Sequence, residues 1–449
     1  MKNSAIFFCD EKALNNIIKY KVDDLFGLNQ RLLIAPTYIV KNYPKIKNVK
    51  KFKSSWSKKD IQIFTDYFYL KNFFNRNNGS LNLYLRTRFF GPYKIKNLKT
   101  FMLIFFSMFK FIRTINWYFI FENRQSTPSE FIKSMKSKKI IAADDTALFT
   151  KYLRDEKIRF VITVATFKNP QVNDFLQACK MLSIPSVALP DCWDNIVTAP
   201  TLPEEISHLL VWSRQQKNHV TKFYPYLAKN TEIIGSYRIK TNKQGKAKLK
   251  LLKKPKIFLL YLEGYIYEDL NHAIDKIVGC IVDSFSGTVM FREIFIRIRH
   301  YPWPRQKEAA SSPVFRTRIE NNLKIIIESS FHKTLSEDLK GVDLVISELT
   351  TAGLEISFKH KPVFFIGSKK SPRYLDTVKG YSFEFANELH KHLPVINLSK
   401  NNDLKALQFH FTKIINQSSI SSYKRSQLYF GEPLNRKKLK DILKNYELN

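Results

Sequence analysis

Short apolar runs alternate with amphipathic stretches along most of the chain. The runs are four to seven residues long, which suits buried strands, and the stretches between them have apolar residues at helical spacing. This alternation predicts parallel, doubly wound sheets with helices on their faces. Strands are expected at 5–9, 32–35, 139–143, 159–165, 184–189, 208–212, 231–234, 256–262, 294–299, 323–328, 342–347 and 363–366. Helices are expected at 11–26, 147–154, 172–181, 215–223, 267–284, 334–339 and 354–359.

One stretch interrupts this pattern and divides the chain. Residues 241–255 carry many lysines and few apolar residues, which is typical of a flexible cationic linker. An N-terminal α/β domain is therefore expected at 1–240 and a C-terminal α/β domain at 256–430. The end of the chain, 431–449, is expected to form a basic helix with its apolar residues on one face.

The most informative stretch follows the strand expected at 342–347. Thr350 and Thr351 open a small turn that leads through Gly353 into a short helix. Hydroxyl side chains cap helices, and such a turn lies at the carboxyl edge of a parallel sheet, where ligands bind. Helix starts offer free N–H groups to phosphates. On geometry alone, an ordinary βαβ unit without a ligand is an equally good interpretation.

The residue string favours a ligand site. Asp343-Leu-Val-Ile-Ser347, Gly353-Leu-Glu355 and Lys361-Pro-Val-Phe-Phe365 together resemble the donor-site segment of GT-B glycosyltransferases. The resemblance is to enzymes that build bacterial capsule and lipopolysaccharide, and to the related CDP-glycerol-type polyol-phosphate transferases. It implies that the turn contacts the phosphates of the donor and that the glutamate holds its ribose. These roles would fall to Thr350, Thr351, Gly353 and Glu355.

A second string supports the same resemblance. Trp193-Asp194-Asn195 follows an expected strand and is similar to a segment of the same enzymes. The resemblance implies two Rossmann-like domains that face a cleft, with the acceptor held by the N-terminal domain and the donor by the C-terminal domain. It also implies a metal-independent reaction without a cofactor, in which Arg299 and His300 stabilise the donor phosphates. Tyr301 separates His300 from Pro302, a departure from the family's Arg-x-His-Pro pattern.

The reaction needs a base for the acceptor hydroxyl. Carboxylates at the expected strand ends of the N-terminal domain are the candidates, although aspartate also caps helices and turns routinely. Asp194 is the first candidate because it lies in the Trp-Asp-Asn string, and Asp145 is the second. Asp10, Asp144 and Asp191 lie at similar positions.

Amino-acid composition further limits the classes of protein to which the chain can belong. Hydrophobic residues make up 44% of the chain and aromatic residues 14%, which is enough for globular cores. The 74 Lys and Arg against 39 Asp and Glu give a formal charge of +35, which suggests a polyanionic partner or an anionic membrane surface. The four cysteines lack metal-ligand spacing and suit a reducing cytosol. P-loop, zincin and hydrolase-elbow motifs do not occur.

Two segments suggest contact with a membrane. Residues 101–121 are mostly apolar, but Lys110 and Arg113 lie near the middle, where charge is costly in a bilayer. An amphipathic interfacial helix and a buried helix fit equally well. Residues 41–59 are cationic, with Phe52 and Trp56 interleaved; a solvated surface is expected, with lipid or nucleic-acid contact as the alternative. We expect a cytoplasmic protein, peripheral on the inner face of the cytoplasmic membrane.

Three functions follow from these observations. The leading hypothesis is a glycosyltransferase that moves a sugar from a nucleotide-sugar donor to a surface polysaccharide or its lipid-linked precursor. The neighbouring alternative is a polyol-phosphate transferase with a CDP-activated donor. A nucleic-acid-binding protein would explain the positive charge, but the sequence contains no recognised nucleic-acid module.

Overall fold

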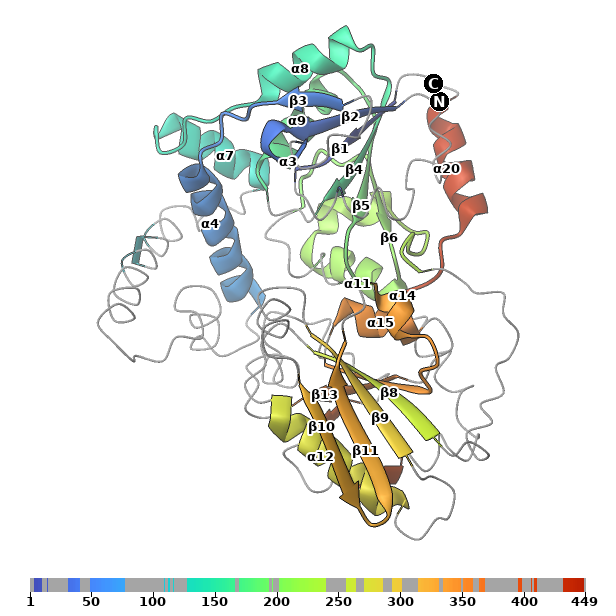
Figure 1. The fold of residues 1–449 in the computed structure, drawn as a ribbon. Coiled ribbons are helices and arrows are strands. Elements are labelled where there is room, and N and C mark those ends of the chain that lie inside the picture. The colour runs from blue at the N-terminus through green and yellow to red at the C-terminus, as the bar shows by residue number, and fades with distance from the viewer. Residues whose placement is uncertain are drawn as a thin grey trace. The chain divides into compact units, whose positions relative to one another are not determined.

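The computed structural model divides the chain into two compact units (Figure 1). Unit 1 consists of Met1–Arg238 together with Phe430–Asn449, and unit 2 consists of Ile239–Tyr429. Each unit is built around a seven-stranded sheet. The structure describes residues 4–9, 14, 31–40, 49–76, 109, 112–113, 116, 127–165, 169–193, 196, 202–239, 256–263, 270–285, 293–300, 314–330, 334–348, 350–357, 363–367, 395–397, 405, 408–409 and 431–447.

The strands of unit 1 all pair in parallel, in the order β3-β2-β1-β4-β5-β6-β7. From β1, the chain adds β2 and β3 on one side of the sheet and then β4 to β7 on the other. The strand order therefore reverses between β1 and β4. Apolar runs suit these strands because both faces of a covered parallel sheet are buried. The strands are β1 (Ser4–Phe7), β2 (Arg31–Pro36), β3 (Val49–Phe52), β4 (Phe160–Ala165), β5 (Ser186–Pro190), β6 (His208–Val211) and β7 (Thr231–Ile233).

Helices cover both faces of this sheet (Figure 1). On one face Phe7 stacks on Phe175 with 4.0 Å between ring centroids, in a core shared with three helices. On the other face Phe8 and Leu439 belong to one buried cluster, so the end of the chain returns to unit 1. The helices are α3 (Thr37–Val40), α8 (Thr146–Asp155), α9 (Gln171–Met181), α11 (Arg214–Phe223), the 3-10 helix η2 (Pro225–Asn230) and α20 (Arg436–Glu447).

A separate hydrophobic cluster joins α4 (Lys58–Arg76) to α7 (Pro128–Ser137). Tyr67 of α4 stacks on Phe131 of α7 with 4.0 Å between ring centroids. Thr127 begins α7 with a capping box: its side chain accepts from the backbone of Glu130, whose side chain accepts from Thr127 in return.

One predicted strand in unit 1 is wrong, and the alternative role of the cationic stretch is excluded for its described aromatic residues. Residues 139–143 were expected to form a strand but form an irregular connection. Lys139 turns the chain with a φ of 56°, and Ile141 packs into the α4–α7 cluster instead of a sheet. The described part of the cationic stretch, 49–59, contains strand β3. Lys51, Lys53, Lys58 and Lys59 are exposed there, as a solvated surface requires, whereas Phe52 is buried. Trp56 is buried as well, so neither aromatic side chain is available to lipid or nucleic acid.

The sheet of unit 2 has the order β10-β11-β9-β8-β12-β13-β14. Only the edge pair β10–β11 is antiparallel among the described pairings. The order reverses between β8 and β12. The strands are β8 (Lys256–Leu262), β9 (Glu293–Arg299), β10 (Phe315–Glu320), β11 (Leu323–Ser329), β12 (Leu344–Ser347), β13 (Val363–Gly367) and β14 (Val395–Asn397).

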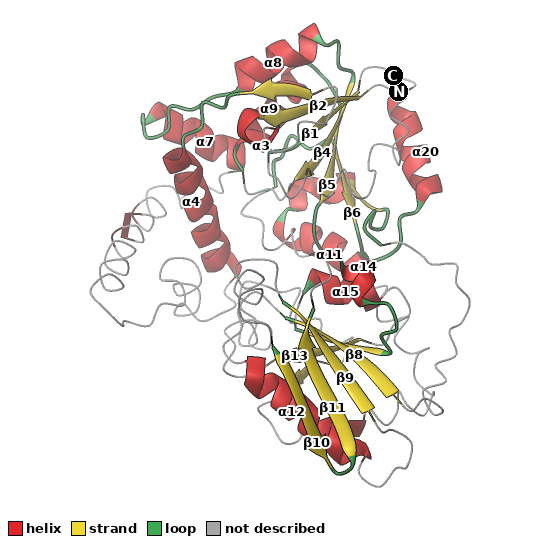
Figure 2. Ribbon diagram, viewed as in Figure 1, coloured by secondary structure: helices red, strands yellow, loops and turns green. Residues whose placement is uncertain are grey.

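Among the helices of unit 2 whose bounds are described, one is long and two are short (Figure 2). The apolar face of α12 (Leu270–Phe285) packs on the sheet, where Ile277 and Ile296 share the buried core. The short helices α14 (Leu335–Asp338) and α15 (Thr351–Ser357) immediately precede and follow β12 along the chain. Both therefore connect to strands near the point where the strand order reverses.

The predicted fold class, two parallel-sheet α/β units of the GT-B-like kind, is confirmed by these sheets. The cleft between them stays a prediction. No helix among the described residues is both long and apolar enough to cross a bilayer. The helix expected at 11–26 (apart from Leu14, which is helical), the linker at 241–255 and most of 101–121 lie outside the described residues.

Candidate functional site

The candidate site of unit 2 lies at the carboxyl edge of its sheet. The neighbouring strands β9, β8 and β12 run in parallel, so their carboxyl ends meet at this edge. Backbone hydrogen bonds extend the pairing beyond the strands: the N–H of Glu263 donates to Arg299 (3.1 Å), and the N–H of Glu348 donates to Leu262 (3.0 Å). The reversal of strand order falls between β8 and β12, the position where open α/β sheets bind ligands.

His300 follows β9 directly, and its imidazole is nearly buried between two polar groups. Nδ1 lies 3.0 Å from Oε2 of Glu263, and Nε2 lies 2.9 Å from Oγ of Ser329. The Ser329 hydroxyl also accepts a hydrogen bond from the N–H of Val314 (2.8 Å). In a neutral imidazole Nδ1 would donate to the carboxylate and Nε2 would accept from the serine, whereas an imidazolium would donate from both nitrogens. In either form the ring is held in one orientation.

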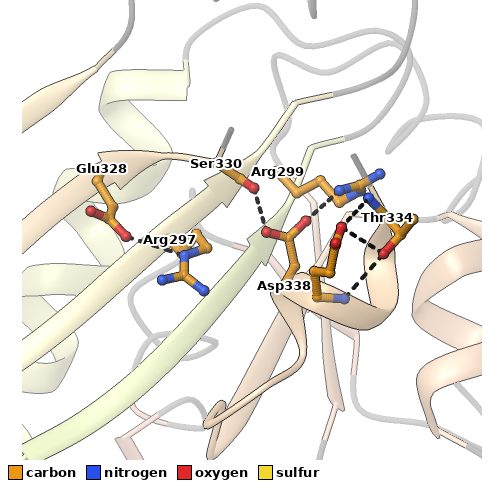
Figure 3. Close-up of polar contacts among 7 residues, drawn as sticks. Arg297, Arg299, Glu328, Ser330, Thr334 and Asp338 are labelled. Atoms are coloured by element: carbon orange, nitrogen blue, oxygen red, sulfur yellow. Dashed lines mark hydrogen bonds and ion pairs between the residues drawn. The ribbon is translucent and has the colours of Figure 1, made fainter. Parts of the chain in front are cut away.

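Arg299, the last residue of β9, pairs with the fully buried carboxylate of Asp338 (Figure 3). The same carboxylate accepts from the hydroxyl of Ser330, which follows β11. Asp338 lies at the end of α14, whose capping box is formed by Thr334 and Glu337. Asp338 of the short helix thus holds the guanidinium of Arg299, and Ser330 at a strand end holds the carboxylate of Asp338 in turn.

The predicted donor turn has clear structural roles. Thr350 caps α15: its Oγ1 accepts from the N–H of Gly353 (3.1 Å) and lies 3.1 Å from Oγ of Ser347. Gly353 is the contact point of α15 with the sheet, because a Cβ there would lie 2.4 Å from Oγ of Ser347. Thr351 is the first residue of α15, and Glu355 is half-buried one turn later.

Sequence reasoning missed the carboxylates at this edge. Glu263 holds His300 and Asp338 holds Arg299, and Glu348 accepts a hydrogen bond from the hydroxyl of Tyr261 (2.7 Å). For Glu263 and Glu348 the available signal was a glutamate just after a buried strand, whereas Asp338 lies at the end of helix α14. The partners of all three depend on the order of the strands. Among the described residues, Arg299 and His300 each lie beside a carboxylate, and the edge presents both donors and acceptors.

In unit 1 the two predicted bases differ in what the structure shows. Asp194 and Asn195 lie outside the described residues. Asp145 is buried: its carboxylate accepts from Oγ of Ser54 (2.5 Å) and from the N–H of Ser55 (2.8 Å). Asp144, and not Asp145, accepts from the N–H of Thr146 at the start of α8 (2.9 Å). Asp145 therefore anchors the segment after β3, and a catalytic role for it stays a prediction.

The described part of the Trp-Asp-Asn string is held by side chains from elsewhere in unit 1. Nε2 of Gln216 donates to the carbonyls of Cys192 (3.1 Å) and Trp193 (2.9 Å). Arg238 donates to the carbonyl of Asp191 (2.7 Å), whose carboxylate accepts from the hydroxyl of Tyr237 (3.2 Å). Burial raises the pKa of Tyr237 well above its ordinary value, so this hydroxyl stays a donor. The string is thereby fixed at the carboxyl end of β5.

Among the described residues, no group of three or more His, Cys, Asp or Glu side chains is placed to hold a metal ion. A metal-independent reaction stays a prediction.

No protein-family model and no curated protein matches the chain. Several solved structures are similar along nearly its whole length. MurG of Acinetobacter baumannii has a TM-score of 0.48 at 9% identity, covering 99% of each chain. The lipopolysaccharide outer core galactosyltransferase WaaB has a TM-score of 0.44 at 9% identity, covering 98% of this chain and 99% of that one. UDP-GlcNAc 2-epimerase of Methanocaldococcus jannaschii, in complex with UDP-GlcNAc and UDP, has a TM-score of 0.40 at 13% identity, with coverages of 98% and 99%. None of these similarities assigns a function to this chain.

Proposed function

We propose that this protein is a glycosyltransferase that transfers a sugar from a nucleotide-sugar donor to a surface polysaccharide or its lipid-linked precursor. The observation that carries the proposal is the convergence of Arg299, His300 and Glu263 at the carboxyl edge of unit 2. This edge adjoins the reversal of strand order between β8 and β12, a usual place for a nucleotide in an α/β sheet.

In this proposal the donor edge stabilises the leaving diphosphate. The acceptor oxygen replaces the diphosphate oxygen on the anomeric carbon of the sugar, and the hydroxyl proton passes to a carboxylate base, for which Asp194 is the first candidate. Arg299 and His300 stabilise the negative charge that develops on the leaving group. Both side chains are already oriented by buried carboxylates, so little reorganisation accompanies the reaction.

Glu355 is the proposed ribose contact, and Thr350, Thr351 and Gly353 shape the turn beside it. A hydrogen bond between a carboxylate and a hydroxyl contributes roughly 1.5–3 kcal/mol. Glu355→Gln should therefore lower nucleotide affinity about ten- to a hundredfold. Glu320→Gln is the matched control, because Glu320 lies at the opposite end of the sheet beside the β10–β11 turn.

Thermal shift with UDP, GDP, CDP and TDP, and with nucleotide sugars of each, tests the proposal. Stabilisation by at least one ligand, weakened in Glu355→Gln but unchanged in Glu320→Gln, supports a donor site. Selective stabilisation by CDP-linked ligands, with release of CMP on turnover, would instead favour the polyol-phosphate transferase. A protein that no nucleotide stabilises would not be a transferase of either kind.

A further inference from the structure

A large pocket in unit 1 lies outside the donor turn and the Trp-Asp-Asn string, and Asp144 is the one candidate base that lines it. It has a volume of about 970 Å³ and is formed by one face each of α7, α8 and α9. This volume is in the range of small-molecule sites. The described lining residues are Ser129, Glu130, Ile132, Lys133, Lys136, Asp144, Thr146, Ala147, Thr150, Lys151, Arg154, Asp155, Asn173, Asp174, Gln177 and Met181.

The first turn of α9 supplies hydrogen-bond acceptors to this pocket. Asn173 is only 3% exposed, and its Oδ1 is buried without a hydrogen-bond partner. An unsatisfied buried acceptor of this kind costs about 1–3 kcal/mol. Next to it, Oδ2 of Asp174 accepts from Nε1 of Trp56 (2.6 Å) and from the N–H of Asp145 (2.9 Å), which fixes the carboxylate in place. A ligand that brings hydroxyl donors would satisfy Asn173.

Three basic side chains of the pocket are placed to meet an anion. Four basic and four acidic residues line it, so its formal charge is zero, but three of the four acids already have described partners. Asp144 pairs with Lys136 at 2.9 Å, Glu130 caps the start of α7, and Asp174 accepts two hydrogen bonds. Of the acids, only Asp155 makes no described hydrogen bond or ion pair. The basic residues without a described ion pair are Lys133, Lys151 and Arg154.

We propose that this pocket binds an anionic saccharide, with sugar hydroxyls donating to Asn173 and the acidic group held by Lys133, Lys151 and Arg154. The negative charge could belong to a sugar phosphate or to an acidic residue of a glycan, and both have the same recognition chemistry. The site belongs to unit 1 alone and does not depend on the proposed donor chemistry of unit 2.

Calorimetric titration of the full-length protein tests this site with four probes: glucose 6-phosphate, hexagalacturonate, glucose and inorganic phosphate. We expect glucose 6-phosphate or hexagalacturonate to bind at least tenfold more tightly than glucose and phosphate do. Binding of glucose 6-phosphate identifies a sugar phosphate as the source, and binding of hexagalacturonate alone identifies an acidic glycan.

Two sets of variants separate a built site from a generally basic surface. Lys151→Ala/Arg154→Ala removes exposed charges from the pocket, and Lys180→Ala/Arg214→Ala removes the same charges from exposed positions of unit 1 that do not line it. The first pair should weaken binding at least tenfold and the second should not. Asn173→Ala should weaken binding of the saccharide probe but not of phosphate. Equal loss in both pairs, phosphate binding as tight as sugar phosphate binding, or no binding of any probe would overturn the proposal.

Discussion

Gly353 shows how closely one residue can determine the packing of the candidate site. A Cβ at this position would lie 2.4 Å from Oγ and 2.8 Å from Cβ of Ser347, and 2.9 Å from Cε1 of Phe365. Gly353→Ala should therefore push α15 away from the sheet and destabilise unit 2 by about 1–3 kcal/mol. Gly279→Ala is the control, because nothing lies within 4 Å of a Cβ there and it is in the middle of α12. Urea unfolding should show a loss for Gly353→Ala and none for Gly279→Ala; equal effects would contradict the close contact.

Asp174 gives the stability of unit 1 a pH dependence. Burial raises the pKa of its carboxyl from an ordinary value of 3.8 to about 6, against the hydrogen bonds from Asp145 and Trp56. Between these two values the folded protein binds more protons than the unfolded chain, so stability falls as pH rises from about 4 to 6 and then levels off. The full effect is roughly 3 kcal/mol. Asp174→Asn should therefore gain stability relative to the wild type from pH 4 to pH 7 in urea titrations; a constant difference would argue against the raised pKa.

At this scale the sequence predicted which residues lie at strand ends but not what they contact. Arg299 and His300 follow an apolar run, and a parallel sheet brings such residues to its carboxyl edge. Their partners Asp338, Glu263 and Ser329 come from other segments. Those pairings depend on which strands are neighbours, and a local pattern carries no information on that.

At the scale of elements, the strand predictions failed where apolar runs and strands do not coincide. Strand β10 carries charged side chains such as Arg316 and Arg318 on an edge, so it lacks the apolar run that marks the buried strands. The sequence feature that could have indicated this strand is the turn after it. Asn321 and Asn322 both adopt positive φ (48° and 64°), as a two-residue hairpin turn requires. The strand expected at 139–143 is the reverse case, because a buried apolar run can also fill a cluster between helices.

Helix α20 is the element whose place was hardest to foresee. Its basic, amphipathic pattern predicted a helix, and the structure packs its apolar face on the sheet of unit 1, more than two hundred residues away in sequence. Around this core, Tyr446 lies 2.5 Å from Nδ1 of His208, and Lys438 pairs with Glu232 at 3.1 Å.

This packing predicts that α20 stabilises unit 1. Leu439 is fully buried, so Leu439→Ala should destabilise the unit by about 2–5 kcal/mol. Lys440→Ala changes the neighbouring, exposed residue and should stay within about 0.5 kcal/mol of the wild type. Guanidinium unfolding followed by tryptophan fluorescence compares the two. Similar midpoints for both variants would mean that the helix is not docked in solution.

At the scale of the whole molecule, the alternation of strands and helices was enough to predict two parallel-sheet units. It could not give the order of strands, because β1 pairs with β2 and also with β4, more than 150 residues later. Nor could it show the pocket of unit 1, because that pocket needs α7, α8 and α9 to meet. Long-range pairing is a property of the assembled unit and leaves little trace in any one segment.

Membrane attachment is the last prediction, and it concerns the segment 101–121. Of this segment the structure describes Phe109, Ile112, Arg113 and Asn116, which are helical and exposed. Phe109 is 58% and Ile112 50% exposed, and their spacing of three places them on one face of a helix. Such a face inserts into the headgroup region, while nearby lysines add about 1 kcal/mol each on anionic lipid. Lys110 and Arg113 argue against a transmembrane span.

We therefore expect the protein to sediment with vesicles of phosphatidylglycerol and phosphatidylethanolamine at low salt, and to be released by high salt or alkaline carbonate. Phe109→Asp/Ile112→Asp should abolish sedimentation with the vesicles, because a carboxylate replaces each of these two apolar side chains. Phe315→Asp/Ile319→Asp is the matched control, since Phe315 and Ile319 are also exposed, at 72% and 76%, but lie on the edge strand of unit 2. Retention through both washes would indicate a transmembrane helix, and loss of binding in both variants would mean that exposed apolar surface in general, rather than this segment, holds the protein on the membrane.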